Sequence, residues 1–432
     1  MKYYSTRNKN ISVDFKTALM QGLSKEGGLF MPESIPALPK PVISEIEKYS
    51  YNELNYIAAK EFIGNEIPSE KLQDIVEASI NFPAPLIELG DELNILELFH
   101  GPTLAFKDFG ARFMSKTMEY FNAGSGKALN ILVATSGDTG SAVANGFYGA
   151  EGINVFILYP SGKISAIQEK QIATLDKNIT ALEVDGTFDD CQNLVKQAFV
   201  HKELNAKLNL TSANSINIAR LIPQMFYYIG AYKQLKGKKR KIVVSVPSGN
   251  LGNITAGIFS KKMGIPFSIF IGASNVNDSF TEFMNTLRFK PKKSVQTLSN
   301  AMDVGNPSNL ERLTELYSGG TEKIREDITS SSYNDEMTKL GIKELYEKFN
   351  YVIDPHGSVG YLALKNYMSR LSGEKVSGIL IETAHPAKFK DAVEGVIGNK
   401  IDIPARLAEC ILKEKKSVKI SNSLSELKEI LL

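Results

Sequence analysis

The residue most suggestive of chemistry is Lys107, which lies between Phe106 and Asp108 in the segment FHGPTLAFKDFGARF, from Phe99 to Phe113. Burial among apolar side chains disfavours the charged form of a lysine and lowers its pKa, and enzymes use such amines to form Schiff bases. Taken alone, the segment is explained at least equally well by a lysine whose alkyl chain packs against apolar residues while its ammonium stays in water. The other polar segments of the chain favour the first interpretation.

A second segment, SGNLGN, follows an apolar run that predicts a strand and precedes a predicted helix. Glycines let a loop turn several backbone N–H groups toward one point, and a helix N-terminus adds partial positive charge. These features are typical of a phosphate-binding loop, although the spacing matches neither a Walker A motif nor a dinucleotide fingerprint. An ordinary helix start capped by Ser or Asn explains the segment alone equally well.

Three further segments contain groups that suit an anion or a heterocycle. Residues 136–140, SGDTG, have the same strand–loop–helix placement and offer hydroxyls and N–H groups for a carboxylate or phosphate. Residues 214–220 combine two amides, a hydroxyl and the guanidinium of Arg220, which suit a phosphate ester. Thr383 follows the last predicted strand, where its hydroxyl could reach a ring nitrogen. A capped helix start is the commoner meaning of the first two segments in isolation.

These segments need a scaffold that brings them together, and the alternation of strands and helices after residue 128 predicts one. Apolar strands joined by helices indicate a mostly parallel sheet covered on both faces. Ligands bind at the carboxyl ends of the strands in such sheets, where the polar loops can converge. The predicted strands are 129–135, 154–159, 179–184, 241–246, 267–271 and 378–381.

Helices and domain limits can also be predicted from the pattern. Helical periodicity appears at 52–63 and 68–80, and longer helices are expected at 188–208 and at 217–235, where Pro223 should kink the helix or lie in its first turn. The proline-rich run 81–85 reads as an extended linker. We therefore expect an N-terminal unit at 1–97 and a catalytic region at 98–432, with a smaller subdomain at roughly 128–225.

Composition narrows the class of protein. The 432 residues are 43% hydrophobic and 23% charged, as expected of a globular chain with two or three packing units. A formal net charge of +2 gives no reason to expect nucleic acid or a membrane as a partner. The sequence contains 2 cysteines, Cys191 and Cys410, far apart, which favours a reducing, cytoplasmic location. The 4 histidines lack metal-ligand spacing, so no metal site is predicted.

Longer stretches around these segments resemble the threonine synthase family, whose members depend on pyridoxal phosphate. The resemblance covers essentially the whole chain, in the family's order. It implies the tryptophan-synthase-β-like fold type II, an α/β fold of mostly parallel twisted sheets with helices on both faces and an extra N-terminal unit. The matching stretches include GLSKEGGLFMP, ELFHGPTLAFKDFGARFM, ATSGDTGSAV, ILYPSGKIS, SANSINIARL, SVPSGNLGN, SNAMDVGNPSN and ETAHPAKF.

The resemblance also implies roles for individual residues. Lys107 is expected to form the Schiff base with pyridoxal 5'-phosphate and to act as the general base. Thr383 should face the pyridine nitrogen of the cofactor. The residues expected at the cofactor phosphate are Gly249, Asn250, Leu251, Gly252 and Asn253. Those expected at the substrate carboxylate are Ser136, Gly137, Asp138 and Thr139, and those at the substrate phosphate are Asn214, Ser215, Asn217 and Arg220. Leu251 stands where the family often has phenylalanine.

The reaction implied is the conversion of O-phospho-L-homoserine and water to L-threonine and phosphate, by a monomer or a homodimer. Two alternatives stay open. Another lyase of the same fold type, such as a threonine or serine dehydratase, would need no second anion pocket. A homologue without activity would bind a phosphorylated ligand and turn nothing over, although the presence of Lys107 argues against it.

Overall fold

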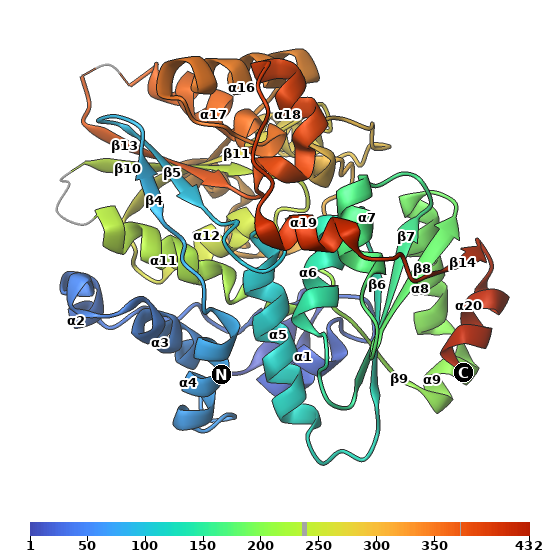
Figure 1. Cartoon of the computed structure of the whole chain (residues 1–432). Coiled ribbons are helices and arrows are strands. Elements are labelled where there is room, and N and C mark those ends of the chain that lie inside the picture. Colours follow the sequence, from blue (N-terminus) through green and yellow to red (C-terminus); the bar gives the residue numbers. More distant parts are fainter. Residues whose placement is uncertain (236–239, 372) are drawn as a thin grey trace.

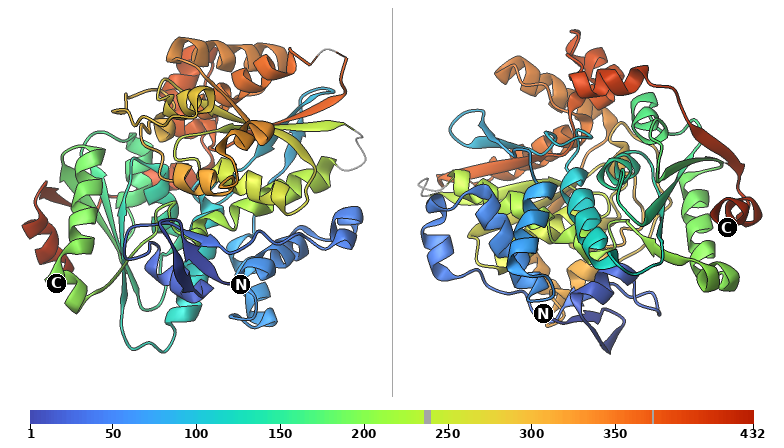
Figure 2. Two further views of the ribbon diagram at one scale, coloured as in Figure 1. Left: turned by 180° about the vertical axis from the view of Figure 1, so that it is seen from behind. Right: turned by 60° about the horizontal axis from the view of Figure 1, so that its bottom comes forward.

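The computed structural model describes residues 1–235, 240–371 and 373–432. Within these ranges the chain forms a three-stranded, a six-stranded and a five-stranded sheet. Figure 1 shows the six-stranded sheet and the five-stranded sheet side by side, with the N-terminal helices below the six-stranded sheet. The two further views in Figure 2 show helices around both larger sheets. This architecture confirms the predicted α/β class with parallel sheets.

The six-stranded sheet has the order β12-β11-β10-β13-β5-β4, and all its neighbouring strands are parallel except β4 and β5. Every residue of β13 is buried, as is expected of a central strand covered on both faces. Helix α17 packs on β10, β11 and β13, while α11 and α12 cover the opposite face (Figure 1). The strands are β4 (Leu86–Glu88), β5 (Leu93–Glu97), β10 (Lys241–Pro247), β11 (Phe267–Ser274), β12 (Ile328–Ser332) and β13 (Val376–Glu382).

The helices associated with this sheet are α11 (Gln224–Leu235), α12 (Gly252–Lys262), α13 (Ser279–Thr286), α14 (Leu310–Glu315), α15 (Ile324–Asp327), α16 (Asp335–Phe349), α17 (Pro355–Met368) and α18 (Lys390–Ile397), with the short turns η2 (Asn300–Met302), η3 (Thr321–Lys323) and η4 (Pro386–Phe389). The expected break at Pro223 is present, because α10 (Ile218–Leu221) ends before it and α11 begins after it. Proline has no N–H to continue a helical hydrogen-bond ladder.

The five-stranded sheet is parallel throughout and has the order β14-β8-β7-β6-β9. Its edge strand β14 comes from the C-terminal part of the chain, which crosses from the large sheet and pairs with β8 (Figure 1). The smaller subdomain therefore extends beyond the expected range 128–225. Its strands are β6 (Leu129–Ala134), β7 (Ile153–Pro160), β8 (Ile179–Asp185), β9 (Asn209–Ser212) and β14 (Ser417–Ser421).

The helices around the five-stranded sheet are α5 (Lys107–Asn122), α6 (Asp138–Gly146), α7 (Ala166–Ala173), α8 (Phe188–Val200), α9 (Lys202–Lys207), α19 (Ala405–Leu412) and α20 (Leu424–Leu431). The prediction of one helix over 188–208 is wrong, because the structure has two helices there. The chain turns at His201, whose side chain accepts a hydrogen bond from the backbone N–H of Leu204 and so caps the second helix.

The N-terminal unit consists of an antiparallel sheet of β1 (Tyr3–Ser5), β2 (Asn8–Val13) and β3 (Phe30–Pro32), followed by helices. These helices are α1 (Phe15–Gln21), α2 (Lys40–Ser44), η1 (Ile46–Lys48), α3 (Tyr51–Ile63) and α4 (Ser69–Ser79). Helix α3 packs on α11, and α4 packs on α5. Strands β4 and β5 belong to the six-stranded sheet, so the sheet places residues 86–97 with the catalytic region rather than with the expected unit 1–97.

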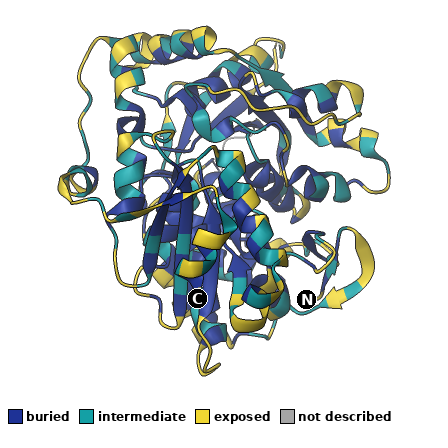
Figure 3. Cartoon of the chain, turned by 90° about the vertical axis from the view of Figure 1, so that its right-hand side faces the viewer, coloured by how far each residue is buried: buried dark blue, intermediate teal, exposed yellow. Residues whose placement is uncertain are grey.

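One apolar core joins the three parts. A single cluster of buried side chains includes Phe15 and Phe62 of the N-terminal unit, Phe113 of α5, Val133 of β6 and Val244 of β10. Figure 3 shows the central strands mostly buried and the exposed residues gathered on outer helices, loops and the strand near the N-terminus. The N-terminal unit is thus packed into the core, against the helix that begins at Lys107. Along the described ranges, no helix is both long and apolar enough to cross a bilayer.

Candidate active site

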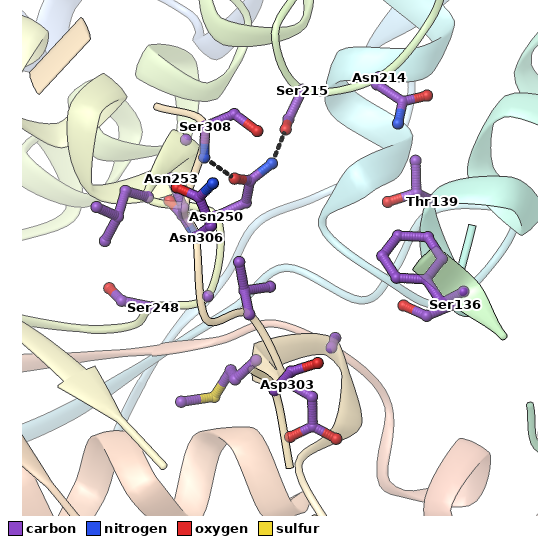
Figure 4. Close-up of a pocket in the computed structure, with 18 of the residues that line it drawn as sticks. Ser136, Thr139, Asn214, Ser215, Ser248, Asn250, Asn253, Asp303, Asn306 and Ser308 are labelled. Carbon is purple, nitrogen blue, oxygen red and sulfur yellow. Dashed lines mark hydrogen bonds between the residues drawn. The ribbon is translucent and has the colours of Figure 1, made fainter. Parts of the chain in front are cut away.

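A cavity of about 500 Å³ lies where the carboxyl ends of strands from both larger sheets meet. Figure 4 shows its two walls, with Ser136, Thr139 and Asn214 on one side and Ser248 and Asn250 on the other. Most of the predicted site residues line it: Lys107, Ser136, Thr139, Asn214, Ser215, Arg220, Gly249, Asn250, Leu251, Gly252, Asn253 and Thr383. Gly137, Asp138 and Asn217 do not line it.

Lys107 is the first residue of α5, and the loop before it is fixed to the end of β13. The N–H of Phe106 donates to the carbonyl of Thr383 at 2.9 Å, and Ala105 forms a β-bridge with Ala384. The side chain of Lys107 is half-buried and opens into the cavity. Burial lowers the pKa of Lys107 to about 8; the charge of Asp138 opposes this shift, and that of Arg220 adds to it. The amine is therefore partly uncharged near neutral pH.

The SGNLGN loop connects β10 to α12, and its residues line the cavity together. Leu251 adopts the left-handed conformation with a φ of 60° immediately before the helix. Asn250 is held from both sides, because its Nδ2 donates to Ser215 Oγ at 2.6 Å and its Oδ1 accepts from the N–H of Ser308 at 2.6 Å (Figure 4). The loop is thus ordered by contacts from outside, and the helix N-terminus faces the cavity as an anion site requires.

Two observations on this loop fit a phosphate group. The side-chain nitrogen of Asn253 is buried in the cavity wall and has no hydrogen-bond partner within the described residues. A buried unpaired donor is costly unless a ligand accepts from it. A Cβ on Gly249 would come within 2.8 Å of the carbonyl oxygen of Ala301, so only glycine lets the loop at 300–308 approach this closely. The donors and the close packing suit a phosphate ester.

Thr383 ends β13 at the cavity and is almost buried. The preceding residue, Glu382, is fully buried on the other side of the strand end. Burial and the nearby charge of Asp354 raise the pKa of Glu382 well above its usual range. The group that this strand presents to the cavity is therefore a hydroxyl and a backbone, not a carboxylate.

The loop at 136–140 contributes less to the cavity than its motif suggested. Asp138 points away from the lining and forms a buried ion pair with Lys388, with Oδ1 and Nζ 2.7 Å apart. Burial alone would raise the pKa of Asp138, but the charges of Lys388 and Lys107 outweigh it and hold this pKa well below its usual range. Gly137 has a φ of 139°, and a Cβ there would lie 2.5 Å from Gln168. Both residues therefore have structural tasks in this loop.

The segment 214–220 is divided in a similar way. Arg220 is buried and donates from Nη1 to the carbonyl of Ala213 at 2.6 Å, and its Nε has no hydrogen-bond partner among the described residues. Burial lowers the pKa of Arg220 to about 10. Asn217 instead caps α10, since its Oδ1 accepts from the N–H of Ala219 and its Nδ2 donates to the carbonyl of Leu19. Arg220 thus brings to the cavity a buried positive charge that Asp108 opposes only in part, and Asn217 does not line the cavity.

Sequence reasoning missed part of the lining. Asp303, Asn306 and Ser308 come from the segment SNAMDVGNPSN, whose density of Asp, Asn, Gly and Pro was a signal of a functional loop. His356 was considered only as a metal ligand; its Nδ1 lies 2.8 Å from Asp354 and its Nε2 accepts from the N–H of Ala301. The other missed lining residues include Gln192, Lys196, Gln224, Lys292 and Lys293.

Comparison with known protein families decides the identity of the fold and site. A model described as "Pyridoxal-phosphate dependent enzyme" matches residues 81–382, one described as "Threonine synthase N terminus" matches 2–80, and one described as "Threonine synthase, C-terminal" matches 357–431. The chain belongs to the threonine synthase family. The family models therefore cover all three parts of the molecule, including the N-terminal unit to which sequence reasoning could assign no chemistry.

Individual threonine synthases agree with this placement. The threonine synthase of Escherichia coli is 46% identical over 95% of this chain and 94% of its own length, and that of Saccharomyces cerevisiae is 38% identical over 91% and 89%. The crystal structure of threonine synthase from Escherichia coli superposes with a TM-score of 0.93, covering 100% of this chain and 99% of that chain at 44% identity. The structure of threonine synthase from Brucella melitensis with bound pyridoxal phosphate has a TM-score of 0.93, covering 100% and 98% at 32% identity.

More distant structures share only the fold. A threonine deaminase isoform from Solanum lycopersicum is 16% identical, has a TM-score of 0.58 and covers 84% of this chain and 93% of its own. Across the part of the chain that the structure describes, no group of three or more His, Cys, Asp and Glu side chains could hold a metal ion.

Proposed function

We propose that this chain converts O-phospho-L-homoserine and water into L-threonine and phosphate, with pyridoxal 5'-phosphate bound through Lys107. The observation that carries the proposal is that a single cavity contains the amine of Lys107, the donor-rich loop Ser248–Asn253 and the hydroxyl of Thr383. These are the groups needed for an aldehyde, a phosphate ester and a ring nitrogen, respectively. Membership of the threonine synthase family supports the same substrate.

The residues proposed to hold the cofactor are Lys107, Gly249, Asn250, Leu251, Gly252, Asn253 and Thr383, all in the cavity wall. When bound, pyridoxal phosphate supplies an electron sink that makes the carbon acids of an attached amino acid easier to deprotonate. The Thr383 hydroxyl can donate or accept a hydrogen bond at the ring nitrogen, whereas a carboxylate would favour its protonated form.

Lys107 is proposed to move the protons of the reaction. Its lowered pKa, about 8, leaves a usable fraction of the free amine at neutral pH, which a general base requires. Nζ would take a proton first from Cα and then from Cβ of the substrate, and a proton would return to Cγ after phosphate leaves. Water then adds at Cβ as hydroxide, a proton returns to Cα, and the remaining proton leaves with the phosphate. Lys107 begins a helix that packs on both the N-terminal unit and α6. This packing fixes the backbone from which the amine reaches the substrate.

The opposite wall is proposed to bind the two anionic groups of the substrate. All five residues line the cavity; Ser136 and Thr139 would bind the α-carboxylate, and Asn214, Ser215 and Arg220 the phosphate. Arg220 lines the cavity, and its positive charge suits the oxygen of a leaving phosphate, where negative charge grows. A dehydratase acting on threonine or serine has no use for this second cationic position, so Arg220 favours the phosphorylated substrate.

The proposal is tested by purifying the protein and recording its visible spectrum before and after O-phospho-L-homoserine is added. We expect a chromophore from the Lys107 Schiff base, a spectral change on mixing, and equal amounts of phosphate and threonine released. A protein that deaminates threonine or serine but releases no phosphate from phosphohomoserine would instead be a dehydratase. A colourless protein that takes up no pyridoxal phosphate would contradict the cofactor assignment.

A further inference from the structure

Two adjacent phenols beneath the cavity bind the same atom of the loop that faces it. Tyr227 and Tyr228 lie on α11, and both side chains are fully buried. Each hydroxyl donates to Asn253 Oδ1, and both distances are 2.7 Å. Asn253 is the second residue of α12, so its side chain stands at the helix N-terminus that opens onto the cavity. Two donors on one amide oxygen are enough to use both of its lone pairs.

This arrangement fixes which end of the amide faces the cavity. With its oxygen engaged by both tyrosines, Asn253 can offer only its N–H₂ group to a ligand, and this nitrogen is the buried atom without a partner. Figure 4 shows the Asn253 side chain in the cavity wall beside Asn250. If the amide were flipped, the Tyr227 hydroxyl could donate only to Gln224 Oε1 at 3.4 Å, and the Tyr228 hydroxyl only to the Asn253 backbone carbonyl at 3.2 Å. Both hydrogen bonds are longer than the present ones.

We propose that Tyr227 and Tyr228 are positioning residues that hold the Asn253 amide with its N–H₂ toward the phosphate of pyridoxal phosphate. The inference rests on the proposed function, because it takes the loop Ser248–Asn253 as the cofactor-phosphate site. The phenols do not line the cavity; they leave the Asn253 amide as a donor-only surface toward it. A donor-only surface distinguishes the phosphorylated cofactor from pyridoxal, which has a hydroxyl in place of the phosphate.

The test compares the two aldehydes in Tyr227→Phe, Tyr228→Phe and the double variant. Apoprotein is titrated with pyridoxal phosphate and, separately, with pyridoxal, and Schiff-base formation is followed by absorbance. We expect the double variant to weaken pyridoxal phosphate binding by about tenfold, the value of roughly one lost hydrogen bond to a charged group, and to leave pyridoxal binding unchanged. Each single variant should show a smaller loss. The phosphorus NMR shift of the bound phosphate should also move in the double variant.

Tyr3→Phe is the matched control, since Tyr3 is equally buried and its hydroxyl donates to the carbonyl of Phe62 at 2.8 Å in the N-terminal unit. It removes one buried phenol bond without changing the Asn253 amide, so both affinities should match the parent. An unchanged ratio of pyridoxal phosphate to pyridoxal affinity in the double variant would overturn the inference.

A second variant keeps the inference testable if the double variant does not fold. Asn253→Asp preserves the oxygen that the tyrosines bind and replaces the N–H₂ with a second oxygen. We expect it to lose pyridoxal phosphate affinity by at least about tenfold and to keep that for pyridoxal, because an acceptor then faces an anion. Equal phosphate preference in Asn253→Asp and the parent would overturn the inference. Failure of the parent itself to bind pyridoxal phosphate would instead contradict the cofactor assignment.

Discussion

Two loops of this molecule look alike in sequence and differ in what they do. Residues 136–140 follow β6 and open α6, and residues 248–253 follow β10 and open α12. In the second loop every residue lines the cavity, and a Cβ on Gly252 would be no closer than 3.5 Å to any other group. In the first loop only Ser136 and Thr139 line the cavity, while Gly137 is packed against Gln168 and Asp138 is paired with Lys388.

The difference shows when the hydrogen-bond donors of a strand–loop–helix motif stay available to a ligand. The loop at 248–253 is held by side chains or backbone of other segments, namely Ser215, Ser308 and the tyrosines of α11, so its own backbone can face a ligand. The loop at 136–140 uses its own polar side chain to hold the structure together. Glycine and acidic residues in such a motif therefore indicate a site only when other segments take over the task of holding the loop.

The largest effect should come from the residue between the two loops. Lys107→Ala removes both the Schiff-base amine and the proposed base, so we expect turnover to fall by at least about 10³-fold and the visible chromophore to disappear. Released phosphate and absorbance measure both effects. Lys116→Ala is the control on the same helix, because Lys116 is partly exposed and paired only with Glu119. Turnover retained by Lys107→Ala would remove this residue from its role.

The buried ion pair that distinguishes the first loop should matter most for stability. Asp138→Asn leaves the Lys388 ammonium buried without its counter-charge, so we expect the free energy of unfolding to drop by about 3–5 kcal/mol. Because the Asp138 pKa is depressed in the folded state, its contribution is present above about pH 4 and declines as the pH falls toward that depressed value. Denaturant unfolding at pH 7 and at pH 3 measures both. A double variant with Lys388→Met should recover part of the loss.

The same pair should tune the amine of Lys107 in opposite directions. The charge of Asp138 raises the Lys107 pKa and that of Lys388 lowers it, around a value of about 8. The rate of Schiff-base formation by apoprotein depends on the uncharged amine, so it should rise with pH through this value. We expect Asp138→Asn to move the midpoint to lower pH and Lys388→Met to higher pH. Shifts in the same direction would contradict this electrostatic account.

Substitutions in segment 214–220 should have smaller and more selective effects, because Arg220 lines the cavity and Asn217 does not. Arg220→Ala should raise KM for phosphohomoserine by about 10- to 100-fold, the range for hydrogen bonds to a charged group. Asn217→Ala is the contrast, because it removes a helix cap away from the cavity and should lower stability by about 1 kcal/mol with KM unchanged. Steady-state kinetics and thermal unfolding of both variants separate the two roles. Matching kinetic constants in Arg220→Ala and the parent would exclude Arg220 from the phosphate site.

The smallest effects are expected from alanine substitutions of one glycine in each loop, which should differ in how much they lower stability. Gly137→Ala places a Cβ at a φ of 139° and 2.5 Å from Gln168, and we expect a loss of about 1–3 kcal/mol in stability. Gly252→Ala meets its nearest neighbour, Asn309 Nδ2, at 3.5 Å, so its stability should change by less than about 1 kcal/mol. Thermal unfolding of the two variants measures the difference. Equal losses would mean that the contact between Gly137 and Gln168 does not constrain the first loop.

The sequence predicted those elements that carry their own signal. Strands β6, β7, β8, β10, β11 and β13 are apolar runs and were found, and the break at Pro223 follows from the missing N–H. Strand β12 reads ITSSS, and β14 has a single buried residue, Ile420, so neither resembles a strand outside its sheet. Such edge strands are specified by the neighbour they pair with, which local pattern does not contain.

For the site, the motifs identified which segments converge but not which way each side chain points. Asp138 and Asn217 are polar like their cavity-facing neighbours, and only their contacts with Lys388 and Leu19 show that they point inward. Lys388 lies within the quoted ETAHPAKF stretch and was given no role, because nothing local shows that its ammonium meets a carboxylate far away in the sequence. In the sequence, Tyr227 and Tyr228 cannot be told from ordinary core aromatic residues, because their contact with Asn253 is seen only in the folded structure.

The crossing of the chain from the large sheet to β14 has a consequence for biosynthesis. During translation the smaller sheet lacks one edge until residues 417–421 have left the ribosome, so β8 stays exposed while most of the molecule can already fold. An open strand edge invites pairing with another nascent chain. We therefore expect chains stopped before residue 417 to aggregate more than chains stopped after residue 421, which pelleting of ribosome-released fragments would reveal.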